Sequence, residues 1–212
     1  MPRLVDHEQR REELAAALWR LVLREGIEAA SVRRVAAEAG LSTGSLRHYF
    51  ETQPQLLVFA MELVMQHVSE RVAAIPPGHD RRATAEQLLH EVLPLDSERH
   101  AEMQVWLSFT ARSLVEPALR ELRDRAHAEL RSLCRAAVDL LGAPSPDREA
   151  ERLHALIDGL ALHAVLDPAT TAPARQVELL SAHLDLLSPP GTPARAVRAG
   201  SRPPGSPSGP GP

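Results

Sequence analysis

Two short apolar patterns separated by a glycine occupy residues 31–50, and they constrain the fold more than any other feature of this chain. Ser31 can cap a helix whose inward side chains begin with Val32 and Val35, at helical spacing. Gly40 can adopt the positive φ that a tight turn between two helices requires. The spacing therefore predicts two helices packed across a tight turn, over about 32–39 and about 43–50.

The second of these helices would expose a short, polar surface without acidic side chains. A helix that enters the major groove of DNA presents such a surface to the base edges and phosphates. An isolated helical pair of this kind is also found as a plain hairpin in helical bundles, so the pattern alone leaves both interpretations open. The exposed residues are Thr43, Gly44, Ser45, Arg47, His48 and Tyr49.

The rest of the chain is rich in Ala, Leu, Arg and Glu, which lose little conformational freedom in a helix, and no segment alternates like a strand. We predict an all-α fold of about nine helices. The last residues are rich in Pro, Gly and Ser and should stay disordered. The expected domains are a helix-turn-helix domain over 1–52, a helical ligand-binding and dimerisation domain over 53–188, and a tail over 189–212. The later helices are expected at about 53–75, 81–93, 97–114, 117–142, 147–166 and 173–187.

The net charge of −4 excludes a uniformly basic nucleic-acid binder, but the charge is unevenly spread. The acidic excess falls between residues 51 and 188, outside the helix-turn-helix pattern. The single cysteine, Cys134, excludes an internal disulfide and a cysteine-based zinc cluster. With no signal peptide and no apolar run long enough for a membrane span, we expect a cytoplasmic protein without membrane partners.

The segment from Gly26 to Leu57 closely resembles the DNA-binding domain of TetR-family transcriptional regulators. The matching positions include Val35-Ala36, Ala39-Gly40-Leu41-Ser42 and the terminal Tyr49-Phe50. The stretch 42–50 is most similar to the BetI-like branch of that family. The resemblance implies a bacterial DNA-binding regulator, by family default a repressor, that acts as a homodimer on a palindromic operator and is released by a small-molecule effector.

The resemblance also implies roles for individual residues. Ser42, Ser45 and Tyr49 would contact phosphates, while Arg33, Thr43, Arg47 and His48 would face bases or adjacent phosphates, with Gly44 between them. Hydroxyl groups suit phosphate oxygens, and arginine is the commonest reader of guanine edges. The family usually has a lysine at the start of the fourth helix; Gln53 stands there and adds no charge. Arg34 fits a solvated surface charge as well as a DNA contact.

Beyond the third helix the resemblance gives only architecture, with a ligand pocket and a dimer interface. Pocket candidates on the central helices are Met61, Met65, Trp106, Phe109 and Cys134, although each would fit plain core packing as well. Apolar stripes on the last two helices suggest a four-helix dimer interface, with intrachain core as the alternative. The stripes contain Leu153, Leu156, Ile157, Leu160, Ala164, Val177, Leu180 and Leu184.

Two other classes of protein are alternatives to a regulator. An enzyme is disfavoured, because the chain has no phosphate-binding glycine loop, no nucleophile elbow and no recognisable metal-ligand spacing among its histidines. No catalytic residue, metal or cofactor is therefore expected. An interaction protein that kept the fold is the second alternative. The sequence does not specify the effector, the operator or the target genes. It also does not distinguish a repressor from an activator, or one bound dimer per operator from two.

Overall fold

The computed structural model describes residues 7–46, 49–50, 52–76 and 78–187, and every regular element among them is a helix. This confirms the predicted all-α fold. The predicted tail lies outside the described residues. The α-helices are α1 (His7–Glu25), α2 (Val32–Glu38), α3 (Thr43–Leu46), α4 (Gln53–Ala74), α5 (Arg81–His90), α6 (Ser97–Ser113), α7 (Arg120–Leu141), α8 (Pro146–Leu166) and α9 (Pro173–Leu187), with 3-10 turns η1 (Ile27–Ala29) and η2 (Pro117–Leu119).

Most helix ends follow from local chemistry. The hydroxyl of Ser31 accepts a hydrogen bond from the backbone N–H of Arg34 and caps α2. Thr52 and Gln55 satisfy each other's backbone N–H groups in a capping box that starts α4. Gly40 has φ of 67°, which allows the chain to turn between α2 and α3 at no steric cost.

Three predicted helices differ in extent from the observed ones. The helix expected over about 43–50 is described only for Thr43–Leu46, although the N–H of Phe50 still donates to the carbonyl of Leu46 at 2.9 Å. Residues 117–142 divide into η2 and α7, because Pro117 sits in a tight first turn. The helix expected over 81–93 ends at His90 and is followed by a turn.

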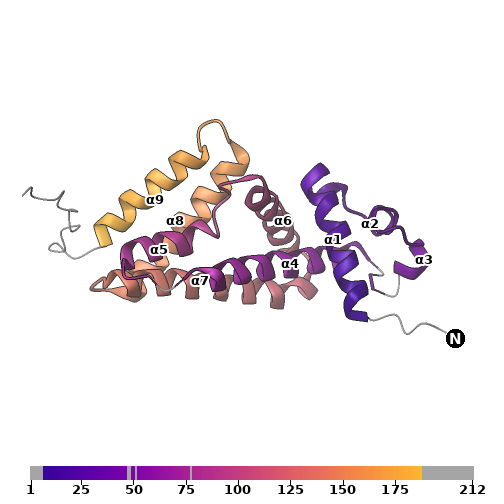
Figure 1. The fold of residues 1–212 in the computed structure, drawn as a ribbon, viewed down its shortest axis with the longest axis horizontal. Coiled ribbons are helices and arrows are strands. Elements are labelled where there is room, and N and C mark those ends of the chain that lie inside the picture. The colour runs from indigo at the N-terminus through magenta and orange to yellow at the C-terminus, as the bar shows by residue number, and fades with distance from the viewer. Residues whose placement is uncertain (1–6, 47–48, 51, 77, 188–212) are drawn as a thin grey trace, which may run out of the picture.

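The helices are arranged in an elongated molecule with α1–α3 at one end and α8–α9 toward the other (Figure 1). The long helix α4 leads from the first group into the second (Figure 1). One buried cluster joins α1–α4 with α6 and includes Leu18, Leu46 and Phe109. A second joins α5, α7, α8 and α9. Burial of these apolar surfaces is the main term that stabilises the fold.

The apolar stripes predicted for a dimer interface on α8 and α9 are largely buried within the single chain. Of the eight residues in the predicted stripes, Leu156 and Val177 are half-buried, and the others are buried within the chain itself. Helix α8 packs on α7 and α9 packs on α5, so these stripes serve the intrachain core. The residues buried in this way are Leu153, Ile157, Leu160, Ala164, Leu180 and Leu184.

Candidate DNA-binding surface and ligand cavity

The helix-turn-helix is held by a small apolar core beneath α2 and α3. Val35, Ala36 and Leu46 are buried, and they pack in the cluster that also contains Leu14 and Leu18 of α1. Ala36 is small where α2 and α3 approach, and the backbone N–H of Leu41 donates to its carbonyl at 2.8 Å. The local sequence therefore fixes the direction in which the outer surface of α3 faces.

That outer surface contains the polar residues predicted from the sequence. Ser42, Thr43, Gly44 and Ser45 are exposed, whereas Tyr49 is half-buried against the core. The Ser42 hydroxyl accepts a hydrogen bond from the N–H of Ser45 and lies 2.9 Å from the Ser45 hydroxyl, so it also caps α3. The predicted contacts Arg47 and His48 lie outside the described residues.

The arginines of this region differ in their partners. Arg34 donates to the Glu25 carboxylate and to the Ala29 carbonyl, which supports the interpretation of Arg34 as a structural surface charge. Arg20 and Arg24 both donate to Glu38. Hydrogen bonds from Arg24 and then Arg20 lower the pKa of Glu38 to about 2.

Arg33 is also exposed on α2, but its surroundings differ from those of Arg34. The ion pairs described on this helix are formed by its neighbours Arg34 and Glu38. Gln53 also differs from expectation. Its amide donates to the carbonyl of Ala30, joining the start of α4 to the turn before α2.

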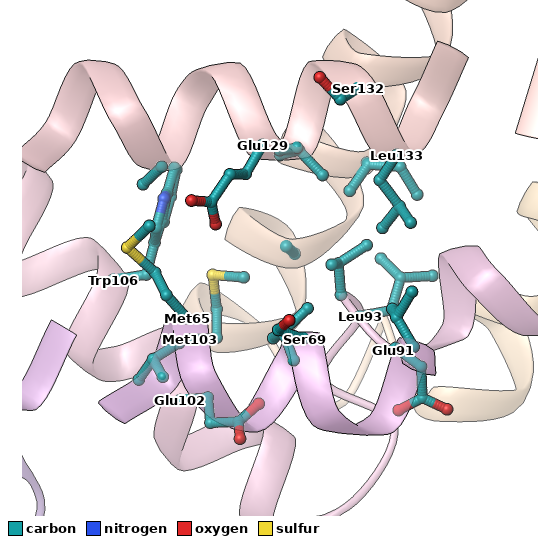
Figure 2. Close-up of a pocket in the computed structure, with 18 of the residues that line it drawn as sticks. Met65, Ser69, Glu91, Leu93, Glu102, Met103, Trp106, Glu129, Ser132 and Leu133 are labelled. Atoms are coloured by element: carbon teal, nitrogen blue, oxygen red, sulfur yellow. The ribbon is translucent and has the colours of Figure 1, made fainter. Parts of the chain in front are cut away.

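A cavity of about 570 Å³ opens between α4, α6, α7 and α8. Its lining is largely apolar and includes Val64, Val68, Leu93 and Leu133, with Trp106 and Met103 at one side (Figure 2). This size and composition are typical of small-molecule sites.

Three of the five predicted pocket residues, Met61, Met65 and Trp106, line this cavity. Phe109 and Cys134 do not, because both are fully buried in the two core clusters. Burial raises the pKa of the Cys134 thiol to about 12, so it remains a protonated, apolar core group.

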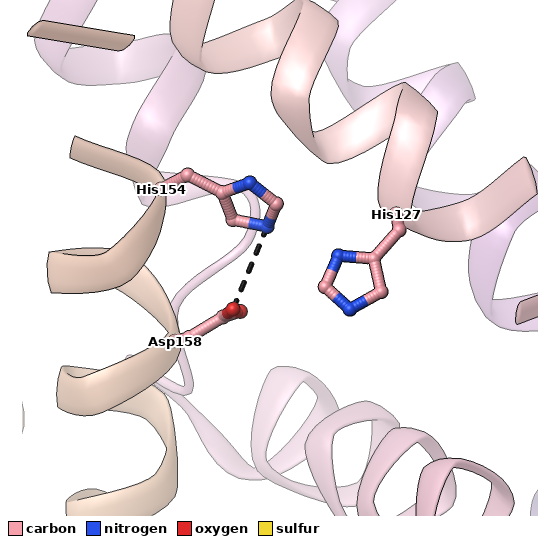
Figure 3. Close-up of side chains that lie close together, drawn as sticks. All are labelled: His127, His154 and Asp158. Atoms are coloured by element: carbon pink, nitrogen blue, oxygen red, sulfur yellow. Dashed lines mark ion pairs between the residues drawn. The ribbon is translucent and has the colours of Figure 1, made fainter. Parts of the chain in front are cut away.

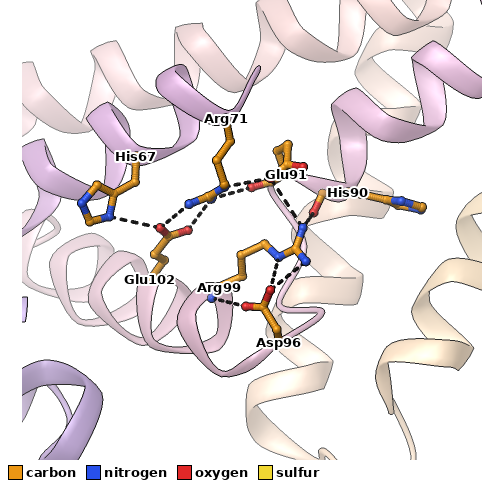
Figure 4. Close-up of polar contacts among 7 residues, drawn as sticks. All are labelled: His67, Arg71, His90, Glu91, Asp96, Arg99 and Glu102. Atoms are coloured by element: carbon orange, nitrogen blue, oxygen red, sulfur yellow. Dashed lines mark hydrogen bonds and ion pairs between the residues drawn. The ribbon is translucent and has the colours of Figure 1, made fainter. Parts of the chain in front are cut away.

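A network of ion pairs forms the wall of the cavity at α4, α6 and the end of α5 (Figure 4). Arg71 of α4 donates to both oxygens of Glu102 at 2.8 and 2.7 Å, and to Glu91 at 2.8 Å. Arg99 donates to Asp96 and to the carbonyl of His90. Two of the cavity carboxylates, Glu91 and Glu102, are therefore already paired.

Glu102 is only 4% exposed, so its charge depends on these partners. Burial by itself would raise the pKa of Glu102, but the contacts from His67 and Arg71 outweigh burial and lower it. Hydrogen bonding to Glu102 likewise raises the pKa of Arg71 above its ordinary value. Both groups stay ionised and hold α4 against α6.

The same network reaches the N-terminal helices. His67 Nδ1 lies 3.4 Å from the Glu102 carboxylate, and its ring meets the Trp19 ring edge-on with centroids 4.9 Å apart. The Ser108 hydroxyl of α6 donates to Glu28 of η1 at 2.9 Å. Helices α4 and α6 therefore contact both the cavity and the segment that carries α2 and α3.

Comparisons with known proteins agree with this architecture. Residues 14–58 match the family described as "Bacterial regulatory proteins, tetR family", and residues 81–189 match "BetI-type transcriptional repressor, C-terminal". The chain is 42% identical over 195 residues to the HTH-type transcriptional regulator PksA of Bacillus subtilis, covering 88% of this chain and 94% of PksA. The chain belongs to the TetR family.

Solved structures of similar proteins have the same fold. A transcriptional regulator from Rhodococcus sp. superposes with a TM-score of 0.73 at 32% identity, covering 84% of this chain and 95% of that one. The multidrug binding protein EbrR, solved with ethidium, superposes with a TM-score of 0.61 at 27% identity, covering 82% and 98%. This TetR-family chain is therefore a transcriptional regulator and not an enzyme.

None of the helices described in this TetR-family chain combines the length and hydrophobicity needed to cross a bilayer.

One cluster in this TetR-family chain was missed by sequence reasoning. His127 of α7 lies opposite His154 and Asp158 of α8, and its ring centroid is 5.2 Å from that of His154 (Figure 3). The signal was present in part, because His154 and Asp158 are four residues apart and share one face of a helix. His127 is distant in the sequence, and only the packing of α7 on α8 brings it near.

We expect Glu102→Gln to lower the free energy of unfolding of this TetR-family protein by about 3 kcal/mol at neutral pH, because it breaks a buried ion pair. The pKa of Glu102 is lowered in the folded state, so its carboxylate stabilises the fold above its ordinary pKa of 4.5, and this contribution is lost as the pH falls below that value. The difference in free energy of unfolding between the wild type and Glu102→Gln should therefore become smaller as the pH is lowered.

Urea unfolding at one protein concentration, at neutral pH and at about pH 4, measures this difference. Glu13→Gln removes an exposed partner of Arg10 and should cost less than about 1 kcal/mol. Equal stability of the wild type and Glu102→Gln at neutral pH would show that the network does not hold α4.

Proposed function

We propose that this TetR-family regulator binds operator DNA with the exposed surface of α3 and with Arg33. We further propose that a small molecule with a positive charge and a large apolar part binds in the cavity and releases the protein from the DNA. The observation that carries the DNA-binding part is the polar, acid-free surface of Ser42–Ser45, which the core beneath α2 and α3 holds outward. Acting on DNA, the protein would work in the cytoplasm as a repressor.

The proposed contacts combine phosphate and base recognition. Thr43, Gly44 and Ser45 are exposed and small enough for the backbone of α3 to approach the groove closely. On the basis of the sequence pattern, we also propose Arg47, His48 and Tyr49 as DNA contacts. Gln53 would act indirectly, since its amide already fixes the start of α4 to Ala30. We also retain 1–52 as the DNA-binding domain and 53–188 as the ligand-binding domain, although one buried cluster crosses that boundary.

Arg33→Ala should weaken binding to operator DNA by about 1–3 kcal/mol without unfolding the chain, because Arg33 is exposed and lies beside the turn before α3. Fluorescence anisotropy with palindromic duplexes from the chain's own upstream region measures the affinity. Arg131→Ala, an exposed arginine on α7, is the matched control and should bind like the wild type. Equal affinity of the wild type for operator and random duplexes would reject sequence-specific reading.

The charges of the cavity favour a cationic effector. Its lining contains the carboxylates of Glu91, Glu102, Glu129 and Asp158, against the guanidinium groups of Arg99 and Arg125. Glu91 and Glu102 are paired within the network. Within the part of the chain that the structure describes, no ion pair joins Glu129 to a cation, and Figure 2 shows its side chain pointing into the cavity.

The other walls suit the apolar part of such a molecule. Trp106 offers an aromatic face to a cation, and Met65 and Met103 adapt to irregular shapes. EbrR, which shares the fold, was solved with the aromatic cations ethidium and proflavin. The cavity of this chain has the size and the charge for a molecule of that class.

Helix α4 would transmit the effect of the ligand. Met61 and Met65 line the cavity, while the same helix begins at Gln53 beside the helix-turn-helix. A ligand that spreads α4 from α7 would tilt α1–α3 and change the distance between the two recognition helices of a dimer. DNA half-sites tolerate little change, because their spacing is fixed near 34–36 Å.

Ethidium, as the probe cation, should bind the wild type, and Trp106→Ala and Glu129→Gln should each weaken that binding about tenfold because a cation–π contact or a charge partner is lost. Fluorescence titration measures the affinity. Glu121→Gln, an exposed position on the same helix α7 that does not line the cavity, is the control. Because ethidium itself intercalates into duplex DNA, the linkage with operator is measured by calorimetry with tetraphenylphosphonium, an aromatic cation that does not intercalate. Operator DNA must weaken its binding to the protein by the factor with which it weakens operator binding. Tetraphenylphosphonium binding that is unaffected by operator would remove the effector role and leave the DNA-binding proposal intact.

TetR-family regulators act as dimers. For this chain we propose the outer surfaces of α8 and α9 as the interface. Leu162 and Leu166 on α8 and Leu186 on α9 are 38%, 70% and 82% exposed. Gly159 lies three residues before Leu162 on the same helix, and a Cβ added there would meet no atom within 4 Å outside the adjoining turns of its own helix. A glycine within a helix costs about 1 kcal/mol relative to alanine, so close approach by a second backbone is the physical reason for it.

Gly159→Arg should convert the dimer into folded monomers, because the space around Gly159 is open within the subunit but would be filled by the partner. Multi-angle light scattering gives the mass, and circular dichroism verifies the helix content. Glu121→Arg on α7 adds the same side chain away from this surface and should leave the dimer intact. A dimer that persists in Gly159→Arg would place the interface elsewhere.

A further inference from the structure

The cluster of His127, His154 and Asp158 has the composition of a metal site. One nitrogen from each histidine and one oxygen from Asp158 all lie within 4.8 Å of one another. His154 and Asp158 are one turn apart on α8, and His127 faces them from α7 (Figure 3). Two imidazoles and one carboxylate are a ligand set that zinc and its neighbours in the periodic table prefer.

The buried histidine provides an independent indication of a ligand. His154 is only 7% exposed, and its Nε2 has no hydrogen-bond partner. Buried polar atoms are nearly always satisfied, so an unpartnered ring nitrogen requires an explanation. It points toward Asp158, whose Oδ2 is 3.5 Å away. This distance is close to the roughly 3.3 Å that separates two ligands on a tetrahedral zinc ion with bonds near 2.0 Å.

A second group of possible ligands in the chain makes a useful contrast. His67, Glu98 and Glu102 also lie within reach of one another. There, however, both oxygens of Glu102 already accept hydrogen bonds from Arg71, and Glu98 is exposed. The ion-pair network therefore accounts for the proximity of His67, Glu98 and Glu102. It does not account for the cluster on α7 and α8. Burial is the main cause that lowers the pKa of His154. The charge of Arg131 lowers it further, but the Arg131 side chain is exposed and its charge is screened by solvent.

We propose that His127, His154 and Asp158 form a binding site for one divalent transition-metal ion of the zinc class. The three residues would occupy three coordination positions and leave a further one for water or another ligand. A bound ion would join α7 to α8 beside the cavity, since Asp158 belongs to both the cluster and the cavity lining. The proposal requires neither DNA nor an effector.

The test uses the full chain without a histidine tag, stripped of metal by a chelator and titrated with Co²⁺, whose visible absorption reports its coordination. The wild type should show saturable binding of one Co²⁺ per chain, displaced by Zn²⁺. His127→Gln and Asp158→Asn should weaken it at least about tenfold. His79→Gln, in the exposed loop before α5, removes an unrelated imidazole and should bind like the wild type.

If substitutions at the more buried positions disturb folding, His127→Gln still tests the metal site, because His127 is half-buried. Zn²⁺ should also raise the melting temperature of the wild type and not that of His127→Gln. Co²⁺ binding as tight in His127→Gln as in the wild type, or no saturable binding by the wild type, would overturn the proposal.

Discussion

Arg71 is held between carboxylates from two different segments, and the position of α4 depends on this contact. The guanidinium group donates to Glu102 of α6 and to Glu91 at the end of α5. Removing charges from water is expensive, and only a geometry with several hydrogen bonds compensates for it. The other end of α4 is fixed by the hydrogen bond from Gln53 to Ala30. The helix is therefore tied to the cavity wall at one end and to the helix-turn-helix at the other.

The parts of the fold that depend on neighbouring residues could be predicted from the sequence. Ser31 and Thr52 cap their helices through hydrogen bonds to residues three positions later, so the pattern itself contains the interaction. The same holds for Gly40, because its positive φ is a property of one residue in one turn. The exposed surface of α3 followed from helical spacing alone.

The parts that depend on distant residues could not be predicted in this way. An apolar stripe on α8 looks the same whether it packs on α7 of the same chain or on a second copy. The stripe containing Leu153 and Ile157 packs within the chain, which leaves Leu162 and Leu166 on the outer surface. Similarly, periodicity places Met65 and Phe109 on central helices but does not tell a cavity wall from a filled core.

The cavity also bears on how long the protein survives in the cell. Apolar side chains that line a cavity make fewer dispersion contacts than those in a packed core, so the walls of the cavity of about 570 Å³ contribute less to stability than a filled core would. A molecule that fills this space stabilises the folded state by mass action. Unfolded chains are removed by proteases, and small changes in stability change protein abundance several-fold. If the proposed effector binds there, the amount of the regulator would be coupled to its occupancy through proteolysis.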